Sequence, residues 1–210
     1  MLKFAREPQL HARLIYDDFC PMEIVASSLP GVCQVLLPRF HDDRGWFAEA
    51  FNAPGFAAAG LPSNFVQDNQ SFSRCNVLRG LHYQLGQPQG KLVRVLAGRI
   101  FDVAVDIRRG SPTFGQHATF ELAAPVAATD PLQLLWIPEG FAHGFLVLSD
   151  SADVLYKTTA GYYPQGERTI VWNDADLAIA WPRGDVTPVV SHKDAEGLTF
   201  AEAKSRGDIF

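Results

Sequence analysis

Hydrophobic and polar residues alternate along much of the chain, in short segments separated by turn-forming residues. In the clearest segment, 99–107, alternate positions hold Phe, Val, Val and Ile, and the positions between them hold Asp, Ala and Asp. A period of two is typical of a β-strand, so the segment predicts a strand with one buried face. The 17 glycines and 14 prolines among 210 residues supply the turns between such strands.

The same pattern extends over most of the chain. It predicts further strands at 32–38, 45–51, 64–69, 78–84, 91–97, 117–122, 133–137, 143–149, 153–159 and 168–172. Only 54–60 and 196–205 read as helices, and both are short. Many short strands joined by turns predict an all-β sandwich or barrel. With no internal repeat or linker, we expect one domain over residues 28–210, preceded by an N-terminal arm of uncertain structure over residues 1–27.

Composition and charge narrow the class of protein. With 47% hydrophobic and 20% charged residues, the chain is typical of a globular protein. A net charge of −5 gives no general attraction to nucleic acid or to an anionic membrane, so phosphate binding requires a local basic cluster. The N-terminus lacks the apolar run of a signal peptide, and no stretch is long enough to span a membrane. Three cysteines, Cys20, Cys33 and Cys75, without metal-site spacing favour reduced thiols in the cytoplasm.

Four strand-like segments carry polar residues that a plain core does not need: 41–49, 65–71, 79–84 together with Lys91 and Arg94, and 136–145. We expect their polar groups to converge on one pocket. In the third segment, Arg79 and His82 are three positions apart, so on a regular strand they face opposite sides. They reach the same side only if Gly80 bends the strand or forms a bulge.

A metal site and a serine hydrolase are both disfavoured by the sequence. The segment 138–143, PEGFAH, resembles the second metal motif of the cupin superfamily. The first motif requires two histidines separated by one residue, but Gln84 stands where the second would follow His82. The ligand set is therefore incomplete, and we expect no metal. No Gly-x-Ser-x-Gly motif of the serine hydrolases occurs.

Several blocks together resemble the dTDP-4-dehydrorhamnose 3,5-epimerase family. The blocks are DxRGxFxE at 42–49, FVQDNQS at 65–71, LRGLHYQ at 78–84, QGKLVRVLAGRIFDVAVDIRRGSPTFG at 89–115, WIPEGFAHGFLVLSD at 136–150, YKTT at 156–159, WND at 172–174 and SHKDA at 191–195. They follow in order over about four fifths of the chain.

This resemblance implies a cupin-type jelly roll that acts as a homodimer on dTDP-4-dehydro-6-deoxy-D-glucose, without metal or organic cofactor. The product would be dTDP-4-dehydro-L-rhamnose, used in dTDP-rhamnose synthesis for cell-surface polysaccharide. Both the C3 and the C5 hydrogens lie alpha to the C4 ketone. One base can therefore remove each proton, and one acid can return a proton to the opposite face.

The resemblance also assigns roles to particular residues. His82 matches the general base, Asp194 the carboxylate that orients it, and Tyr156 the general acid. Lys91 matches either the donor to the enolate oxygen or a phosphate contact, and the sequence leaves both open. Arg44 and Arg79 match residues that hold the pyrophosphate, and Tyr162 matches the aromatic residue that stacks on thymine. The remaining expected substrate contacts are Glu49, Gln67, Asp68, Asn69, His143, Glu167 and Lys193.

Other functions remain open on the sequence alone. A relative that inverts only C3 or only C5 is the nearest alternative. A ketoisomerase of similar fold has different motifs, and a metal-dependent cupin oxygenase lacks a ligand. A catalytically silent sugar-nucleotide-binding protein is an alternative of another class. The presence of base, orienting carboxylate and acid together favours the 3,5-epimerase over the silent protein.

Overall fold

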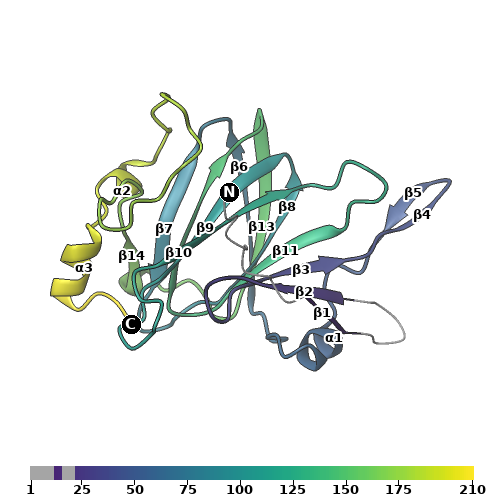
Figure 1. Cartoon of the computed structure of the whole chain (residues 1–210), viewed down its shortest axis with the longest axis horizontal. Coiled ribbons are helices and arrows are strands. Elements are labelled where there is room, and N and C mark those ends of the chain that lie inside the picture. Colours follow the sequence, from purple (N-terminus) through teal and green to yellow (C-terminus); the bar gives the residue numbers. More distant parts are fainter. Residues whose placement is uncertain (1–11, 16–21) are drawn as a thin grey trace, which may run out of the picture.

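The computed structural model describes residues 12–15 and 22–210, which form two antiparallel sheets packed as a jelly-roll sandwich (Figure 1). In spatial order, the larger sheet contains β1 (Ala12–Ile15), β2 (Met22–Ala26), β3 (Cys33–Leu37), β11 (Leu132–Ile137), β8 (Lys91–Ala97), β13 (Ser151–Thr158) and β6 (Gln67–Arg74). The smaller sheet contains β10 (His117–Ala123), β9 (Arg99–Asp106), β12 (Phe141–Val147), β7 (Leu78–Gln84) and β14 (Glu167–Thr169). The expected all-β jelly roll is confirmed.

A hairpin and three short helices complete the described structure. The hairpin of β4 (Phe40–Asp42) and β5 (Gly45–Phe47) projects from the body at the right of Figure 1. Helix α1 (Ala53–Ala58) lies near that side, whereas α2 (His192–Ala195) and α3 (Phe200–Arg206) lie at the opposite end, beside β7 and β14. A short 3-10 turn (Pro164–Gly166) precedes β14. In the described part of the chain, no helix is long and apolar enough to cross a membrane.

Three hydrophobic clusters stabilise these layers. The first lies between the two sheets and includes Val93, Ile100 and Leu135. The second covers the outer face of the smaller sheet, where the C-terminal segment packs through Phe200. The third covers the outer face of the larger sheet beneath α1, whose Phe56 is buried.

The predicted strand 99–107 is present as β9, but the expectation of one buried face is wrong. Both faces are buried because the smaller sheet is covered on its outer side by the C-terminal segment. Asp102 and Asp106 are each fully buried, and each has partners. Asp106 accepts hydrogen bonds from the side chains of Arg108, Ser111 and Thr113, which compensate the cost of burying its charge.

The other predicted elements agree with the structure to different degrees. The strands at 78–84 and 91–97 coincide with β7 and β8, and most others match within two residues. The strand predicted at 45–51 ends at Phe47, and the one at 64–69 begins only at Gln67 and continues to Arg74. The N-terminal arm contributes β1 and β2 to the larger sheet. Residues 1–11 and 16–21, with Cys20, lie outside the described residues, whereas Cys33 and Cys75 are free thiols.

Candidate active site

A histidine of the smaller sheet meets a carboxylate from a distant part of the chain. His82 lies on β7, and its Nε2 is 2.5 Å from Oδ1 of Asp194 on α2. The Asp194 side chain is only 5% exposed, whereas that of His82 is 32% exposed. His82 is therefore the partner that a ligand can reach. With Nε2–H donating to Asp194, Nδ1 carries the lone pair that can accept a proton.

The Asp194 carboxylate is held in its charged form. Burial acts to raise its pKa, but hydrogen bonds from His82, Ser191 and the Gly80 backbone outweigh burial and lower it. Ser191 caps the first turn of α2, with its Oγ accepting from the Asp194 amide at 3.1 Å. This cap fixes the position of the carboxylate opposite the imidazole.

Strand β7 is irregular between Arg79 and His82. The spacing of these two residues requires such an irregularity if both are to face the same side. Against β12, His82 pairs with His143 and Arg79 pairs with Phe145, so that two residues of β7 oppose the single Gly144. Gly80 has φ of +120°, and a Cβ built on it would lie 2.5 Å from the Gly144 Cα. The expected bulge at Gly80 is therefore present, and both glycines are needed for the close approach of the two backbones.

Gly144→Ala is expected to disturb this bulge. A Cβ at position 144 would lie 2.7 Å from the Arg79 carbonyl oxygen, and overpacking of this kind costs about 1–3 kcal/mol. We expect a lower free energy of unfolding in a denaturant titration, with a fall in kcat measured under conditions where the variant stays folded. Gly110→Ala is the matched control, because a Cβ there meets nothing within 4 Å. Equal losses of stability in Gly144→Ala and Gly110→Ala would show that the bulge does not require a glycine at position 144.

A second histidine–carboxylate pair lies beneath the first. His143 on β12 donates from Nε2 to Oδ2 of Asp102 on β9 at 2.8 Å, and both side chains are buried. The pKa of His143 is lowered, mainly by burial, against the opposing effect of Asp102. A neutral imidazole that donates to Asp102 leaves its Nδ1 as an acceptor.

Lys91 is the buried cation of the same region. Its Nζ donates to the His82 carbonyl oxygen at 3.2 Å, and the side chain lies at the start of β8. Burial lowers the pKa of Lys91 to about 8, although Asp102 and Glu167 act to raise it. The ammonium group is thus close to the backbone that carries His82, in surroundings with little water to screen its charge.

A cavity of about 370 Å³ brings half of the predicted residues together. Seven of them line it: Gln67, Asn69, His82, Lys91, Tyr156, Tyr162 and Glu167. Tyr156 lies on β13, and its pKa is raised, first by burial and then by Glu167, while Arg79 opposes the rise. The phenol therefore keeps its proton at neutral pH, as a proton donor requires.

Strand β6 divides the predicted QDN block between two faces. Gln67 and Asn69 face the cavity, and the Gln67 Nε2 donates to the Asn69 Oδ1 at 2.8 Å. Asp68, between them, points to the outer face of the sheet, where Lys157 Nζ donates to it at 3.0 Å. The period-two geometry of a strand explains why consecutive residues separate in this way, and the structure does not bring Asp68 to the cavity.

A chain of polar contacts crosses the edge of the cavity. The Tyr162 hydroxyl donates to Oε2 of Glu167 at 2.8 Å, and the ammonium of Lys193 forms an ion pair with the other carboxylate oxygen. The pKa of Glu167 is lowered, because the bonds from Lys193 and Tyr162 outweigh the opposing effect of burial. Glu167 is therefore charged and occupied by partners of this chain.

A second cavity, of about 340 Å³, adjoins His82 on another side. It is lined by Arg79, Lys193 and Asp194, together with apolar residues of β7 and of the segment before α2. Arg79 Nε donates to the Ser73 Oγ at 2.9 Å, and no carboxylate in the described part of the chain pairs with it. This cavity thus contains two cationic side chains, which suit an anionic group.

Four of the predicted substrate contacts line neither cavity: Asp68, His143, Arg44 and Glu49. Arg44 is on the turn of the β4–β5 hairpin, 90% exposed, and donates from Nη2 to Asp42 at 2.6 Å. Glu49 follows β5 and lines neither cavity. The hairpin projects at the end of the molecule opposite α2 (Figure 1), so the chain by itself does not bring Arg44 and Glu49 to His82.

Some residues of the site were missed by sequence reasoning. Asp102 was placed on the solvent side of a strand, although it is the partner of His143. Gln89 also lines the cavity and, with Gln84 of a segment that was expected there, holds the loop before the 3-10 turn, each donating to the Gly161 carbonyl at 3.0 Å. The signal available for Asp102 was an acidic residue inside an otherwise apolar run, which requires a buried partner.

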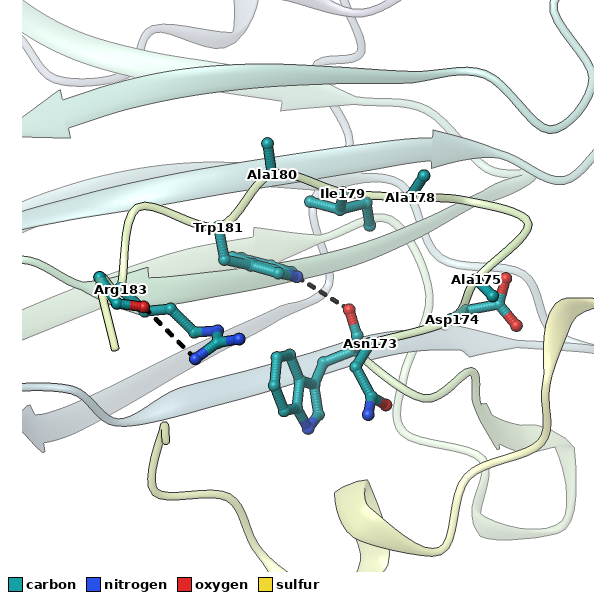
Figure 2. A pocket seen from close by; sticks show the side chains of 10 residues that line it. Asn173, Asp174, Ala175, Ala178, Ile179, Ala180, Trp181 and Arg183 are labelled. Carbon is teal, nitrogen blue, oxygen red and sulfur yellow. Dashed lines mark hydrogen bonds between the residues drawn. The ribbon is translucent and has the colours of Figure 1, made fainter. Parts of the chain in front are cut away.

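Another cavity, of about 450 Å³, lies in the segment 172–184 and is unrelated to this chemistry (Figure 2). Its lining includes Trp181, whose Nε1 donates to the Trp172 carbonyl at 2.8 Å, and Arg183, whose side chain runs beneath it. None of the predicted site residues lines this cavity. Among the described residues, no three His, Cys, Asp or Glu side chains are grouped to hold a metal ion.

The fold and the site define a class of protein: a cupin-type jelly roll whose pocket holds an imidazole paired with a carboxylate, a protonated tyrosine and a buried lysine. Such groups can exchange protons with a bound carbon acid. The family model for dTDP-4-dehydrorhamnose 3,5-epimerase matches residues 26–202, and the chain belongs to this family.

Individual relatives agree with this assignment. The dTDP-4-dehydrorhamnose 3,5-epimerase of Pseudomonas aeruginosa is 55% identical over 168 residues, 79% of this chain and 90% of the relative. A Legionella pneumophila 3,5-epimerase structure in complex with dTDP-4-keto-L-rhamnose matches with a TM-score of 0.78 and 46% identity, over 85% of this chain and 92% of the other. A 3'-monoepimerase from Streptomyces bikiniensis in complex with dTDP-quinovose matches with a TM-score of 0.78 and 32% identity, over 87% and 90%.

Proposed function

We propose that this protein epimerises dTDP-4-dehydro-6-deoxy-D-glucose at C3 and C5 to give dTDP-4-dehydro-L-rhamnose. The observation that carries the proposal is the His82–Asp194 pair, which shares one cavity with Tyr156 in a chain of this family. The product would enter dTDP-rhamnose synthesis for polysaccharide. The free thiols of Cys33 and Cys75 favour a reducing compartment, and we place the reaction in the cytoplasm.

In the proposed mechanism, His82 is the base. Its Nδ1 takes the proton from C5 or C3, and the electron pair moves into the C4 carbonyl to form an enolate. Asp194 positions the imidazole and stabilises the imidazolium that forms. Tyr156 gives its proton to the opposite face of the carbon, which inverts the centre. Each positioned acid or base typically contributes about 10²- to 10⁴-fold to the rate.

Lys91 is proposed to stabilise the enolate oxygen rather than the pyrophosphate. Its ammonium lies beside the His82 carbonyl in the cavity with Tyr156, whereas Arg79 and Lys193 line the other cavity. A buried cation near the developing charge acts without reorganising solvent. The alternative assigned by the sequence, a phosphate contact, fits Arg79 and Lys193 better because they are more exposed.

The lysine gives a prediction for the pH dependence of the rate. With a pKa of about 8, Lys91 loses its charge as the pH rises through 8, so kcat should fall on the alkaline side. In Lys91→Gln, this alkaline fall in kcat should be absent from the residual activity. The measurement is kcat of both proteins at saturating substrate over pH 6–10. An alkaline limb at the same pH in Lys91→Gln would assign it to another group.

The remaining predicted contacts are proposed to bind the nucleotide. Tyr162, Gln67 and Asn69 lie together at one side of the first cavity, where a pyrimidine can stack on the exposed tyrosine ring. Arg79 is proposed to hold the pyrophosphate, and His143, beneath His82, to accept from the sugar. All these residues lie in 28–210, which we propose as the epimerase domain.

We further propose a homodimer, which would give Arg44 and Glu49 a role. Because both lie away from the cavities of their own chain, they can bind substrate only if the hairpin of one protomer reaches the pocket of its partner. Phe40, Trp46 and Phe47 of that hairpin are 50%, 48% and 70% exposed, which supports burial against another surface. A monomer mass in light scattering at the assay concentration would remove this proposal.

The test of the proposed function is incubation with dTDP-4-dehydro-6-deoxy-D-glucose in D₂O, followed by proton NMR of the sugar. Deuterium at both C3 and C5 with formation of the L-rhamno product is the expected result. Exchange at one carbon alone would identify a single-site epimerase, the alternative favoured by the likeness to the 3'-monoepimerase. Binding without exchange at either carbon would leave a silent sugar-nucleotide-binding protein.

A further inference from the structure

The ion pair between Glu167 and Lys193 joins residues that line two different cavities beside His82. Glu167 lines the cavity that contains Tyr162 and Tyr156, and Lys193 lines the cavity that contains Arg79. His82 lines both. A ligand that stacks on Tyr162 and reaches Arg79 with its phosphates would therefore extend across both cavities, close to this ion pair.

The pair is also positioned to be exchanged. Lys193 is 50% exposed and Glu167 26% exposed, and each comes from a different element, α2 and β14. An ion pair with this exposure is only weakly stabilising. A pyrophosphate group carries more charge than a carboxylate and offers more acceptor oxygens, so it can displace Glu167 from Lys193.

We propose that Glu167 competes with the substrate's pyrophosphate for Lys193, so that the ion pair is a gate between the two cavities. This inference rests on the proposed function and changes the role of Glu167. It is a residue that sets affinity for the phosphates by occupying Lys193 in the free protein. On binding, Lys193 transfers to the pyrophosphate and the two cavities become one site that His82 reaches from both sides.

Glu167 also contacts Tyr162, the residue proposed to stack on thymine. The hydroxyl of Tyr162 donates to the same Glu167 carboxylate, and its backbone N–H donates to the Gln67 Oε1 at 3.0 Å. Glu167→Gln keeps an acceptor for the hydroxyl while removing the charge that attracts Lys193. The substitution thus separates the effect on phosphate binding from any effect on stacking.

The experiment is calorimetric titration of the full chain with dTDP, inorganic pyrophosphate and thymidine. For Glu167→Gln we expect dTDP and pyrophosphate to bind about fivefold more tightly, the factor corresponding to loss of a partly exposed ion pair. Thymidine, which lacks phosphate, should bind as before, which also shows that the variant is folded. Glu121→Gln is the matched control, because it breaks an exposed ion pair with Arg99 away from both cavities.

A double-mutant cycle with Lys193→Met distinguishes the gate from simple repulsion. If Glu167 acts by occupying Lys193, the gain from Glu167→Gln disappears in the Lys193→Met background. A gain of the same size or larger there would show that Glu167 only repels the phosphates, and would overturn the proposal. Weaker dTDP binding by Glu167→Gln would also overturn it and make Glu167 a direct substrate contact.

The outcomes for the parent protein separate this proposal from the function on which it rests. A parent chain that binds dTDP and epimerises the sugar, with no gain in Glu167→Gln, overturns the gate alone. A parent chain that binds neither dTDP nor pyrophosphate overturns the proposed function and the gate together.

Discussion

His82→Asn is expected to abolish deuterium incorporation at both C3 and C5 of the sugar in D₂O. Asparagine keeps a polar group of similar size at the cavity wall but has no lone pair basic enough to take a carbon-bound proton. Because the same imidazole serves both carbons, both signals should be lost together, with a fall in rate of about 10²- to 10⁴-fold or more. Proton NMR of the sugar measures each carbon separately.

Binding should survive this substitution. The residues proposed to bind thymine lie on other elements, Arg79 contributes to the phosphate site from another position of β7, and His82 is only one side chain of the cavity wall. The dissociation constant for dTDP, measured by calorimetry, should stay within a fewfold of that of the parent. Retention of exchange at one carbon in His82→Asn would mean that a second base acts there, and would reject the one-base mechanism.

Tyr156→Phe is expected to separate proton exchange from inversion. His82 and Asp194 remain in place, so protons are still removed and deuterium is still returned from the side of the imidazole. Without the phenol, delivery to the opposite face is lost, and formation of the L-rhamno product should fall by about 10²- to 10⁴-fold. The expected spectrum shows deuterium in the substrate with its original configuration.

The ratio of proton exchange to inversion in Tyr156→Phe shows whether Tyr156 is the general acid or has only a structural role. A structural defect would reduce exchange and inversion in the same proportion, whereas loss of the acid spares exchange. Tyr162→Phe is the control, because that hydroxyl contacts Glu167 and is assigned to nucleotide binding. Its effect should fall on KM, with exchange and inversion reduced equally at low substrate. Equal loss of exchange and inversion in Tyr156→Phe would contradict the assignment.

The alternation of hydrophobic and polar residues predicted much of the fold, because most strands bury at least one face and therefore carry hydrophobic residues at regular positions. The strands β7 and β8 have the predicted bounds, since their hydrophobic residues are flanked by clear turns. Strand β6 was misplaced because its sequence, QDNQSFSR, is polar at nearly every position. It is an edge strand with an exposed outer face and a polar cavity on its inner face, and neither face supplies a hydrophobic period.

The candidate site was predicted unevenly for a related reason. The bulge at Gly80 followed from strand geometry and two spaced residues, Arg79 and His82. The burial of Asp102 did not, because alternation alone cannot tell a solvent-facing aspartate from one that meets His143 across the sheet. The position of Arg44 depends on where a hairpin projects from the body, which is decided by long-range packing rather than by local sequence.

His82 and its partner Asp194 come from distant parts of the sequence, and this affects how the site forms when the chain folds. Asp194 lies 112 residues after His82, and every strand of the two described sheets precedes α2. A domain generally folds as a unit, and the segment that carries Asp194 leads into residues such as Phe200 that cover the outer face of the smaller sheet. A chain that lacks this last segment is therefore expected to lose the carboxylate partner of His82 and the cover of the sheet that carries His82 together.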